Sequence, residues 1–288
     1  ERLGLGLRTR VTHEGSSTRE STRHVTRILF VGDIVGGIGK RTLIALLPEL
    51  RERYELQFVV ANGENAAGGL GITPRVADEI FAAGVDVITL GNHTYRHRDV
   101  YPYLDAQPNI LRPANFLRSQ PGHGTCVVER DGVRLGVVNL SGNVFVKAGR
   151  PAFSEADAAL ADLKSRVDHI LVDMHAEATS EKIAVSWFLD GRVSLVFGTH
   201  THVPTADATI RASGSAFITD CGMTGPYNGV IGRVKEAVLK KMRTNVDVLA
   251  MSATPIPRTL EMSLTGIRET STLATPPEER HPVLTYVS

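Results

Sequence analysis

Short apolar runs alternate with helical segments through the first third of the chain, and this alternation limits the folds available to it. Three runs rich in β-branched and aromatic residues cover residues 27–33, 58–61 and 85–90 and predict buried strands. Segments after each run predict helices over residues 43–54, 74–83 and 98–104, with Pro48 expected to kink the first helix or to mark a later start. Strands joined through helices form βαβ units, so we expect a mainly parallel sheet.

From Gly124 onward the pattern includes hairpins. Residues 125–129 and 133–139 flank Asp131-Gly132, a dipeptide typical of a two-residue hairpin turn. The remaining elements are expected as strands over 169–173 and 193–197, helices over 154–166 and 180–189, and a hairpin that turns at Ser213-Gly214. The sequence therefore predicts an α/β fold with mixed sheets and flanking helices.

A glycine-rich stretch, Gly36-Gly37-Ile38-Gly39-Lys40, suggests a phosphate-binding loop but fits neither common type. A Walker A loop needs glycine where this chain has Ile34, and it needs Ser or Thr after Lys40. The dinucleotide-binding fingerprint needs a third glycine where this chain has Thr42. Both nucleotide-loop interpretations are rejected.

Polar side chains follow the predicted strands at five places. They are Asp33, Glu64 with Asn65, Asn92 with His93, His175, and His200 with His202. Open α/β sheets bind ligands at the carboxyl ends of their strands, so we expect these side chains to come together. Residues two apart in an extended segment point the same way, and both imidazoles of His200-Thr201-His202 should reach the cluster.

Carboxylates, imidazoles and amide oxygens form a mixed ligand set that suits manganese, iron or zinc better than thiolate-bound structural zinc. The set is too large for one metal that keeps an open position. Two metals sharing a carboxylate account for it, and metal pairs about 3.5–4 Å apart hydrolyse phosphate esters. Taken singly, Asn92-His93 would be interpreted as a turn, Glu64 as a solvated charge and His175 as a buried histidine with its hydrogen bonds made. Five such clusters at strand ends together favour a metal site.

Composition excludes several other functions. The 288 residues carry a net charge of +1, which gives no electrostatic basis for binding nucleic acid or a membrane surface. No apolar run reaches the length of a membrane-spanning helix. Cys126 and Cys221 show no disulfide or zinc spacing, so a reducing compartment, the cytoplasm, is expected. The sequence leaves open whether the chain forms a homo-oligomer.

Six motifs together resemble a known family. They are Gly32-Asp33, Asn62-Gly63-Glu64-Asn65, Gly91-Asn92-His93, and the runs Asp173–Lys182, Gly198–Asp207 and Asp220–Pro226. They look like the calcineurin-like metallophosphoesterases, and more narrowly like the bacterial branch associated with 2′,3′-cyclic-nucleotide phosphodiesterase activity. The resemblance covers about residues 27–232 and implies a metallophosphoesterase-type layered sandwich.

The resemblance also implies a role for each site residue and two divalent metal ions, iron or manganese, with zinc also accepted. Glu64 would bridge the metals. Asp33 and His202, helped by Asn65, would complete one site, and Asn92, His175 and His200 the other. His93 would be the general acid, and a metal-bridging hydroxide would attack a small phosphodiester such as a 2′,3′-cyclic nucleotide. The wider superfamily has Asp-x-His where this chain has Asp33-Ile34-Val35, which leaves the first metal's ligands less defined.

Three alternatives stay open. The same metals would serve a phosphomonoesterase or nucleotidase, and a damaged fold would be a scaffold without metals. The third alternative, from a different class, is a non-catalytic nucleic-acid translocase fragment carried by the C-terminal segment.

The two ends of the chain differ from the rest. Residues 1–26 are rich in Arg, Ser, Thr and Gly and predict a disordered leader. Residues 233–288, above all 243–260, resemble the Ser-Ala-Thr motif region of transcription-repair coupling factor and the branch-migration helicases. The chain has no Walker A loop and no Asp-Glu-x-His box, and the segment is too short for a motor domain. We interpret it as a fusion or chimera joined within residues 234–243.

Overall fold

The computed structural model describes residues 25–146 and 148–243. Contacts between Cα atoms divide the chain into two units, with the boundary between Arg233 and Val234. The described part of the second unit contains helix α6 (Lys235–Arg243). Most of the predicted leader and residues 244–288 of the predicted helicase-like segment lie outside the described residues. No helix in the described ranges is both long enough and apolar enough to cross a membrane.

The first unit begins with a four-stranded parallel sheet in the order β1-β3-β4-β5. Its strands are β1 (Ile28–Val31), β3 (Phe58–Asn62), β4 (Val87–Thr89) and β5 (Ile110–Leu111). Its helices are α1 (Gly36–Tyr54), α2 (Pro74–Ala82) and α3 (Val100–Ala106). The predicted βαβ units and parallel pairing are confirmed.

The second sheet is mixed and runs in the order β10-β11-β9-β8-β7-β6. Its strands are β6 (Thr125–Arg130), β7 (Val133–Ser141), β8 (His169–His175), β9 (Leu195–Thr199), β10 (Thr209–Ile210) and β11 (Ala216–Ile218). Helices α4 (Ala152–Leu163) and α5 (Thr179–Phe188) complete it. Both predicted hairpins are antiparallel, and Asp131 and Gly132 have φ of 52° and 76°, as the β6–β7 turn requires.

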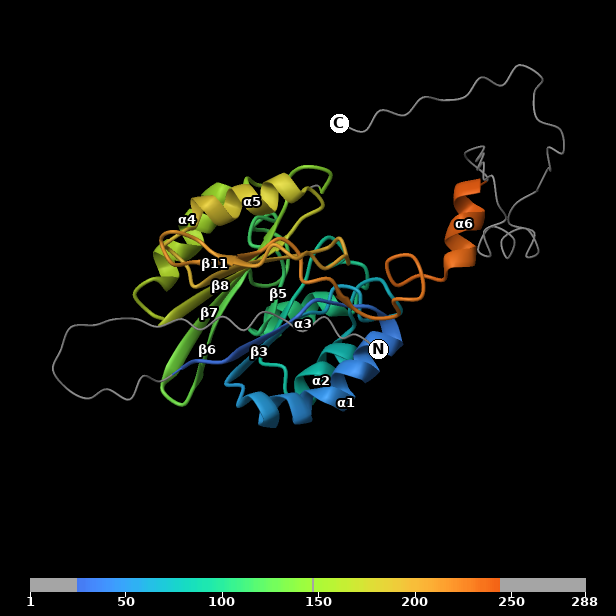
Figure 1. Ribbon diagram of the computed structural model, residues 1–288, viewed down its shortest axis with the longest axis horizontal. Coiled ribbons are helices and arrows are strands. Elements are labelled where there is room, and N and C mark those ends of the chain that lie inside the picture. Colours follow the sequence, from blue (N-terminus) through green and yellow to red (C-terminus); the bar gives the residue numbers. More distant parts are fainter. Residues whose placement is uncertain (1–24, 147, 244–288) are drawn as a thin grey trace, which may run out of the picture. The chain divides into compact units, whose positions relative to one another are not determined.

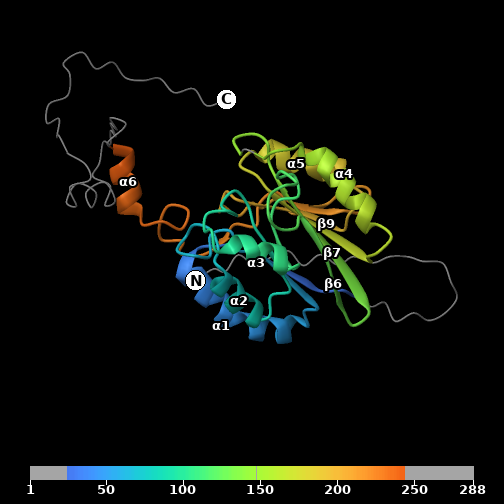
Figure 2. The ribbon, with the colours of Figure 1, turned by 180° about the vertical axis from the view of Figure 1, so that it is seen from behind.

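The two sheets and their helices form a sandwich of four layers, with α1–α3 outside one sheet and α4 and α5 outside the other (Figure 1; Figure 2 shows the same order from behind). Strand β3 shows how alternating side chains hold the layers together. Val59 and Ala61 pack in the cluster that includes Leu47 and Ile80 of the helices, whereas Phe58 and Val60 pack against Val137 and Leu171 of the other sheet. A third cluster lies beneath α4 and α5. The predicted layered sandwich is confirmed.

A short third sheet positions the first site residue. β2 (Asp33–Ile34) pairs in parallel with β12 (Met223–Thr224), so the chain leaves β1 and immediately joins a segment from the end of the first unit. The Val35 amide donates to the Thr224 carbonyl at 3.0 Å. Asp33 is fully buried as a result.

One predicted boundary is wrong. Helix α1 begins at Gly36, not near residue 43, and it continues through Pro48. Gly36 has φ of +61°, and Gly39 lies so close to β12 that an added Cβ would overlap the Thr224 carbonyl. Gly36 therefore serves the turn into the helix, and Gly39 serves the packing of the helix against β12. Pro48 lies on the exposed side of α1, where water can bind the carbonyl that lost its amide partner.

We predict that Gly39→Ala lowers the free energy of unfolding by about 1–3 kcal/mol, because the new methyl group overpacks the α1–β12 contact. Chemical denaturation of both proteins measures the change. Gly37→Ala on the same helix is the control, since its Cβ would meet only the mobile end of Arg41 at 3.1 Å. Equal stability of the two variants would contradict the prediction.

Candidate metal centre

The structure brings the eight predicted site residues together at the carboxyl ends of the strands. Asp33 lies on β2, Glu64 and Asn65 follow β3, Asn92 and His93 follow β4, His175 ends β8, and His200 and His202 follow β9. Four of them are at most 3% exposed, namely Asp33, Glu64, Asn65 and His175. Their role as metal ligands stays a prediction, but their juxtaposition is a property of the fold.

One half of the cluster contains Asn92, His175 and His200. His175 Nε2 lies 3.0 Å from Asn92 Oδ1 and 3.1 Å from His200 Nδ1. The two imidazoles meet edge to face. In the described part of the chain, Glu64, His175 and His200 offer ligand atoms that all lie within 4.8 Å of one another.

The other half contains Asp33, Asn65 and His202. His202 Nε2 lies 3.2 Å from Asn65 Nδ2 and 3.6 Å from Asp33 Oδ1. Asp33 Oδ2 accepts a hydrogen bond from the His200 amide at 3.0 Å, whereas its buried Oδ1 has no hydrogen-bond partner. An unpaired, buried carboxylate oxygen is costly unless a cation binds it.

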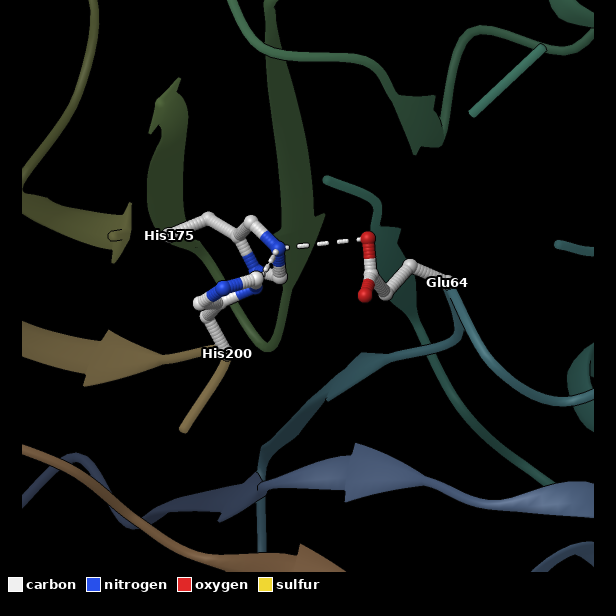
Figure 3. Close-up of side chains that lie close together, drawn as sticks. All are labelled: Glu64, His175 and His200. Atoms are coloured by element: carbon white, nitrogen blue, oxygen red, sulfur yellow. Dashed lines mark hydrogen bonds and ion pairs between the residues drawn. The ribbon is translucent and has the colours of Figure 1, made fainter. Parts of the chain in front are cut away.

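Glu64 lies between the two halves and contacts both. Its Oε2 is 3.2 Å from His175 Nε2, and its Oε1 accepts from Asn65 Nδ2 at 2.8 Å. Figure 3 shows the carboxylate facing His175, with His200 beside that ring. The neighbouring Gly91 leaves this space open, because a Cβ there would overlap His175 Nε2 and Glu64 Oε2.

The outer nitrogens of the two imidazoles in the first half are already engaged. His175 Nδ1 lies 2.9 Å from Thr199 Oγ1, which donates to Asp173 Oδ1 at 2.7 Å. His200 Nε2 lies 2.9 Å from Glu177 Oε2. Each outer nitrogen thus carries its ring's proton, and the nitrogens that face each other are both acceptors.

When both rings are neutral, acceptor atoms therefore converge without a donor among them. His175 Nε2, His200 Nδ1, Asn92 Oδ1 and Glu64 Oε2 all present lone pairs to the same small space. Only a proton or a metal cation there makes this arrangement favourable. Burial alone would lower the pKa of His175, but Glu64, Asp33 and Asp173 raise it to about 9. The donor set thus fits divalent cations.

His93 stands at the edge of the cluster, with a side chain that is 30% exposed. Its Nδ1 lies 2.9 Å from Asn65 Oδ1 and 3.2 Å from Glu64 Oε1, and its amide donates to Glu64 Oε2. These contacts fix the ring through Nδ1 and leave Nε2 to interact with a bound molecule. That geometry suits a proton donor better than a buried ligand.

The His200-Thr201-His202 segment differs from its prediction. It is not extended, because His200 and His202 have φ of 96° and 65°. The buried Asp220 holds it, accepting from the Thr201 amide and hydroxyl and from Lys182 Nζ at 2.6 Å. Both imidazoles still reach the cluster, from a tight turn rather than by the period of a strand.

Sequence reasoning missed the residues that support the ligands. Thr199 and Asp173 orient His175, Glu177 orients His200, and the Ile231 carbonyl lies 3.0 Å from His202 Nδ1. Burial raises the pKa of Asp173 to about 6, against the opposing effects of His175 and of hydrogen bonds from Thr89, Thr199 and Asn62. The length of the motifs was the sequence feature that could have indicated these supporting residues, since Asp173, Glu177 and Thr199 all lie in the long motifs around the histidines.

Comparison with known proteins defines the class and then the family. A crystal structure of a phosphatase from Mycoplasma pneumoniae superposes with a TM-score of 0.70 at 34% identity, over 77% of this chain and 80% of that one. The 2′,3′-cyclic-nucleotide 2′-phosphodiesterase of Bacillus subtilis is 45% identical over 222 residues, which are 77% of this chain and 84% of that protein. The fold is of the metallophosphoesterase type, and the protein is a phosphoric ester hydrolase.

The chain belongs to the YmdB-like protein family, whose model matches residues 29–276. The predicted family resemblance is therefore confirmed. The match extends beyond residue 232, where the sequence predicted the end of this domain, and that boundary stays a prediction.

The C-terminal part has a second similarity, as predicted. The transcription-repair-coupling factor of Staphylococcus haemolyticus is 62% identical over 55 residues. Those residues are 19% of this chain but only 5% of that protein. The chain therefore spans a small fraction of the length of this relative.

We predict that Thr199→Val weakens metal binding about 10–100-fold, because His175 loses the hydroxyl that fixes its Nδ1 proton. Calorimetric titration of metal-free protein with Mn²⁺ measures the affinity. Thr89→Val is the matched control: Thr89 is equally buried and also donates to Asp173, at 2.5 Å, but has no contact with His175. Equal affinities in the two variants would exclude the orienting role of Thr199.

Proposed function

We propose that this protein is a two-metal phosphodiesterase that hydrolyses small phosphodiesters such as 2′,3′-cyclic nucleotides. The observation that carries the proposal is the convergence of lone pairs from Asn92, His175, His200 and Glu64, beside the unpaired oxygen of Asp33. The substrate class follows from the name of the Bacillus subtilis relative.

The two halves of the cluster would each hold one metal. Asp33 and His202 would bind the first, with help from the amide oxygen of Asn65. Asn92, His175 and His200 would bind the second, with Glu64 in contact with both. Iron or manganese fits these nitrogen and oxygen ligands, and zinc is compatible with them. When bound, such a pair supplies positive charge for the phosphoryl oxygens and activates water for attack on phosphorus.

His93 would act on the leaving group. Hydrolysis adds a water oxygen to phosphorus and breaks one phosphorus–oxygen bond, so the departing ribose oxygen must receive a proton. The Nδ1 contacts to Asn65 and Glu64 orient the imidazole so that Nε2 faces away from them. His93 Nε2 would then deliver the proton to the ribose oxygen.

A phosphomonoesterase or nucleotidase on the same metals is the alternative activity. It would favour a nucleoside monophosphate over a cyclic nucleotide, so turnover of 2′,3′-cyclic AMP against AMP separates the two. We assign the protein to the cytoplasm because Cys126 and Cys221 are both free thiols. A small-molecule phosphodiester is the proposed partner; nucleic acid and membrane have no proposed role.

The segment from Val234 onward we propose to be separate from the hydrolase. The division of contacts at Arg233 and the similarity to transcription-repair-coupling factors support this. Its resemblance covers only a small piece of a translocase, so we assign it no motor activity.

We predict about two metals per purified chain, falling sharply in Glu64→Ala, because this carboxylate contacts both halves of the cluster. Elemental analysis measures the content, and circular dichroism checks the fold. Glu129→Ala, an exposed change on β6, is the control and should keep both metals. A folded wild-type chain with much less than one metal would exclude the proposed function.

We predict that His93→Ala lowers kcat for 2′,3′-cyclic AMP by about 10²–10⁴-fold, because the ribose oxygen leaves without a proton. The loss should be much smaller for bis(p-nitrophenyl) phosphate, since nitrophenolate is a good leaving group. Steady-state kinetics on both substrates, at equal metal content, measures the difference. Equal losses would assign His93 a role other than proton donation.

A further inference from the structure

An exposed aromatic residue in a strained backbone lies in the loop after β7. Phe145 is 85% exposed and has φ of +67°, a conformation that bulky side chains rarely adopt. Neither feature helps the chain to fold, because the ring lies in water and the backbone is strained. Such positions concentrate at functional sites, where the surrounding structure holds them.

The loop begins beside the metal centre. Ser141, the last residue of β7, is paired with His175 in the sheet, and the Gly142 amide donates to the His175 carbonyl at 2.9 Å. A Cβ on Gly142 would lie 2.8 Å from the Cβ of Ala176. The first residue of the loop thus packs directly against the segment that carries a predicted ligand.

The base of the loop is held by hydrogen bonds at both ends. The Asn115 side chain accepts from the Ser141 amide and donates to the Ser141 carbonyl, each at 2.8 Å. At the other end, the Arg150 amide donates to the Asn115 carbonyl at 2.9 Å. These bonds fix where the loop leaves β7 and where it approaches α4.

A carboxylate from α5 holds the residues that lead to Phe145. Glu181 accepts from the Asn143 amide at 2.7 Å and from the Val144 amide at 3.1 Å. The chain is therefore anchored up to the residue before Phe145, and the aromatic ring projects from a supported backbone. An exposed ring on such a support is positioned rather than loose.

The distance suits a nucleotide. Phe145 follows Gly142 by three residues, so their Cα atoms lie within about 11 Å of each other even in a fully extended chain. In a cyclic nucleotide the base lies one ribose away from the phosphate. A phosphate at the metal centre therefore places the base within reach of this loop.

We propose that Phe145 is a specificity residue on which the nucleobase of the substrate stacks. The proposal rests on the proposed phosphodiesterase function and adds the residue that would distinguish nucleotides from other cyclic phosphates. Aromatic stacking accepts every base, because each has a π-face. The site would therefore favour nucleotides over base-free phosphodiesters while discriminating little among bases.

The test compares Phe145→Leu with Phe145→Trp on two substrates. Leucine keeps the apolar bulk and the same backbone demand but removes the aromatic face; tryptophan restores it. For 2′,3′-cyclic AMP we expect KM to rise roughly 10-fold in Phe145→Leu and to stay near the wild-type value in Phe145→Trp. For glycerol 1,2-cyclic phosphate, which has the same ring and no base, KM should be unchanged in both variants. Phe153→Ala, another exposed phenylalanine, is the control.

Two outcomes of the kinetic comparison overturn the proposal. Equal changes on both substrates would show that the loop shapes the site without stacking, and no change on cyclic AMP would show that the ring does not contact the base. A binding measurement keeps the test independent of turnover. Trp187 is the only tryptophan in the chain, so Phe145→Trp with Trp187→Phe carries one fluorescent reporter. Quenching by cyclic AMP but not by the glycerol compound supports stacking, even if neither compound is hydrolysed. Absence of hydrolysis would refute the proposed function and leave the stacking intact. Absence of quenching by cyclic AMP would overturn the stacking.

Discussion

The convergence of lone pairs at the carboxyl ends of β3, β4, β8 and β9 is the constraint on which the rest of this structure depends. His175 Nε2 and His200 Nδ1 face each other at 3.1 Å, with Glu64 Oε2 3.2 Å from the same nitrogen of His175. Acceptors do not attract one another, so the fold must hold them together until a proton or a metal cation binds. The supports in the structure serve this purpose: Thr199 and Asp173 behind His175, Glu177 behind His200, and Gly91 keeping the space free of a side chain.

The four layers explain how such an unfavourable cluster is maintained. Three separate apolar clusters hold the sheets and helices together, and this packing offsets the cost of burying polar residues at the strand ends. Two segments distant in sequence then close the site. The β2–β12 pair buries Asp33, and the fully buried Lys182–Asp220 ion pair fixes the loop that carries both histidines. A buried ion pair of this kind adds little net stability, but it holds the loop in one conformation.

Sequence reasoning was accurate where the determinants are local. The alternation of apolar runs predicted the strands, Asp131-Gly132 predicted a hairpin, and polar residues after strands predicted which side chains meet. It failed where tertiary contacts decide. The glycines that begin α1 resembled a loop, because the contact that Gly39 makes with Thr224 involves a residue far away in the sequence. Likewise, nothing local indicates that Thr199 will accept a hydrogen bond from His175 or that Asp220 will accept hydrogen bonds from Thr201.

Residues with strained backbone are found mainly near the cluster of polar side chains rather than in the apolar layers. Six residues other than glycine have positive φ in the described chain, and Glu55 and Asp131 have ordinary explanations as a helix end and a hairpin turn. Of the other four, His200, His202 and Ile231 lie in loops at the cluster, and Phe145 lies in the loop whose first residue, Gly142, contacts His175. Ile231 is β-branched, so its φ of 45° is especially unfavourable, yet its carbonyl lies 3.0 Å from His202 Nδ1 and directs Nε2 toward Asp33. Strain is therefore concentrated at predicted metal ligands and at the residue for which we propose substrate contact, and the apolar layers supply the stability that tolerates it.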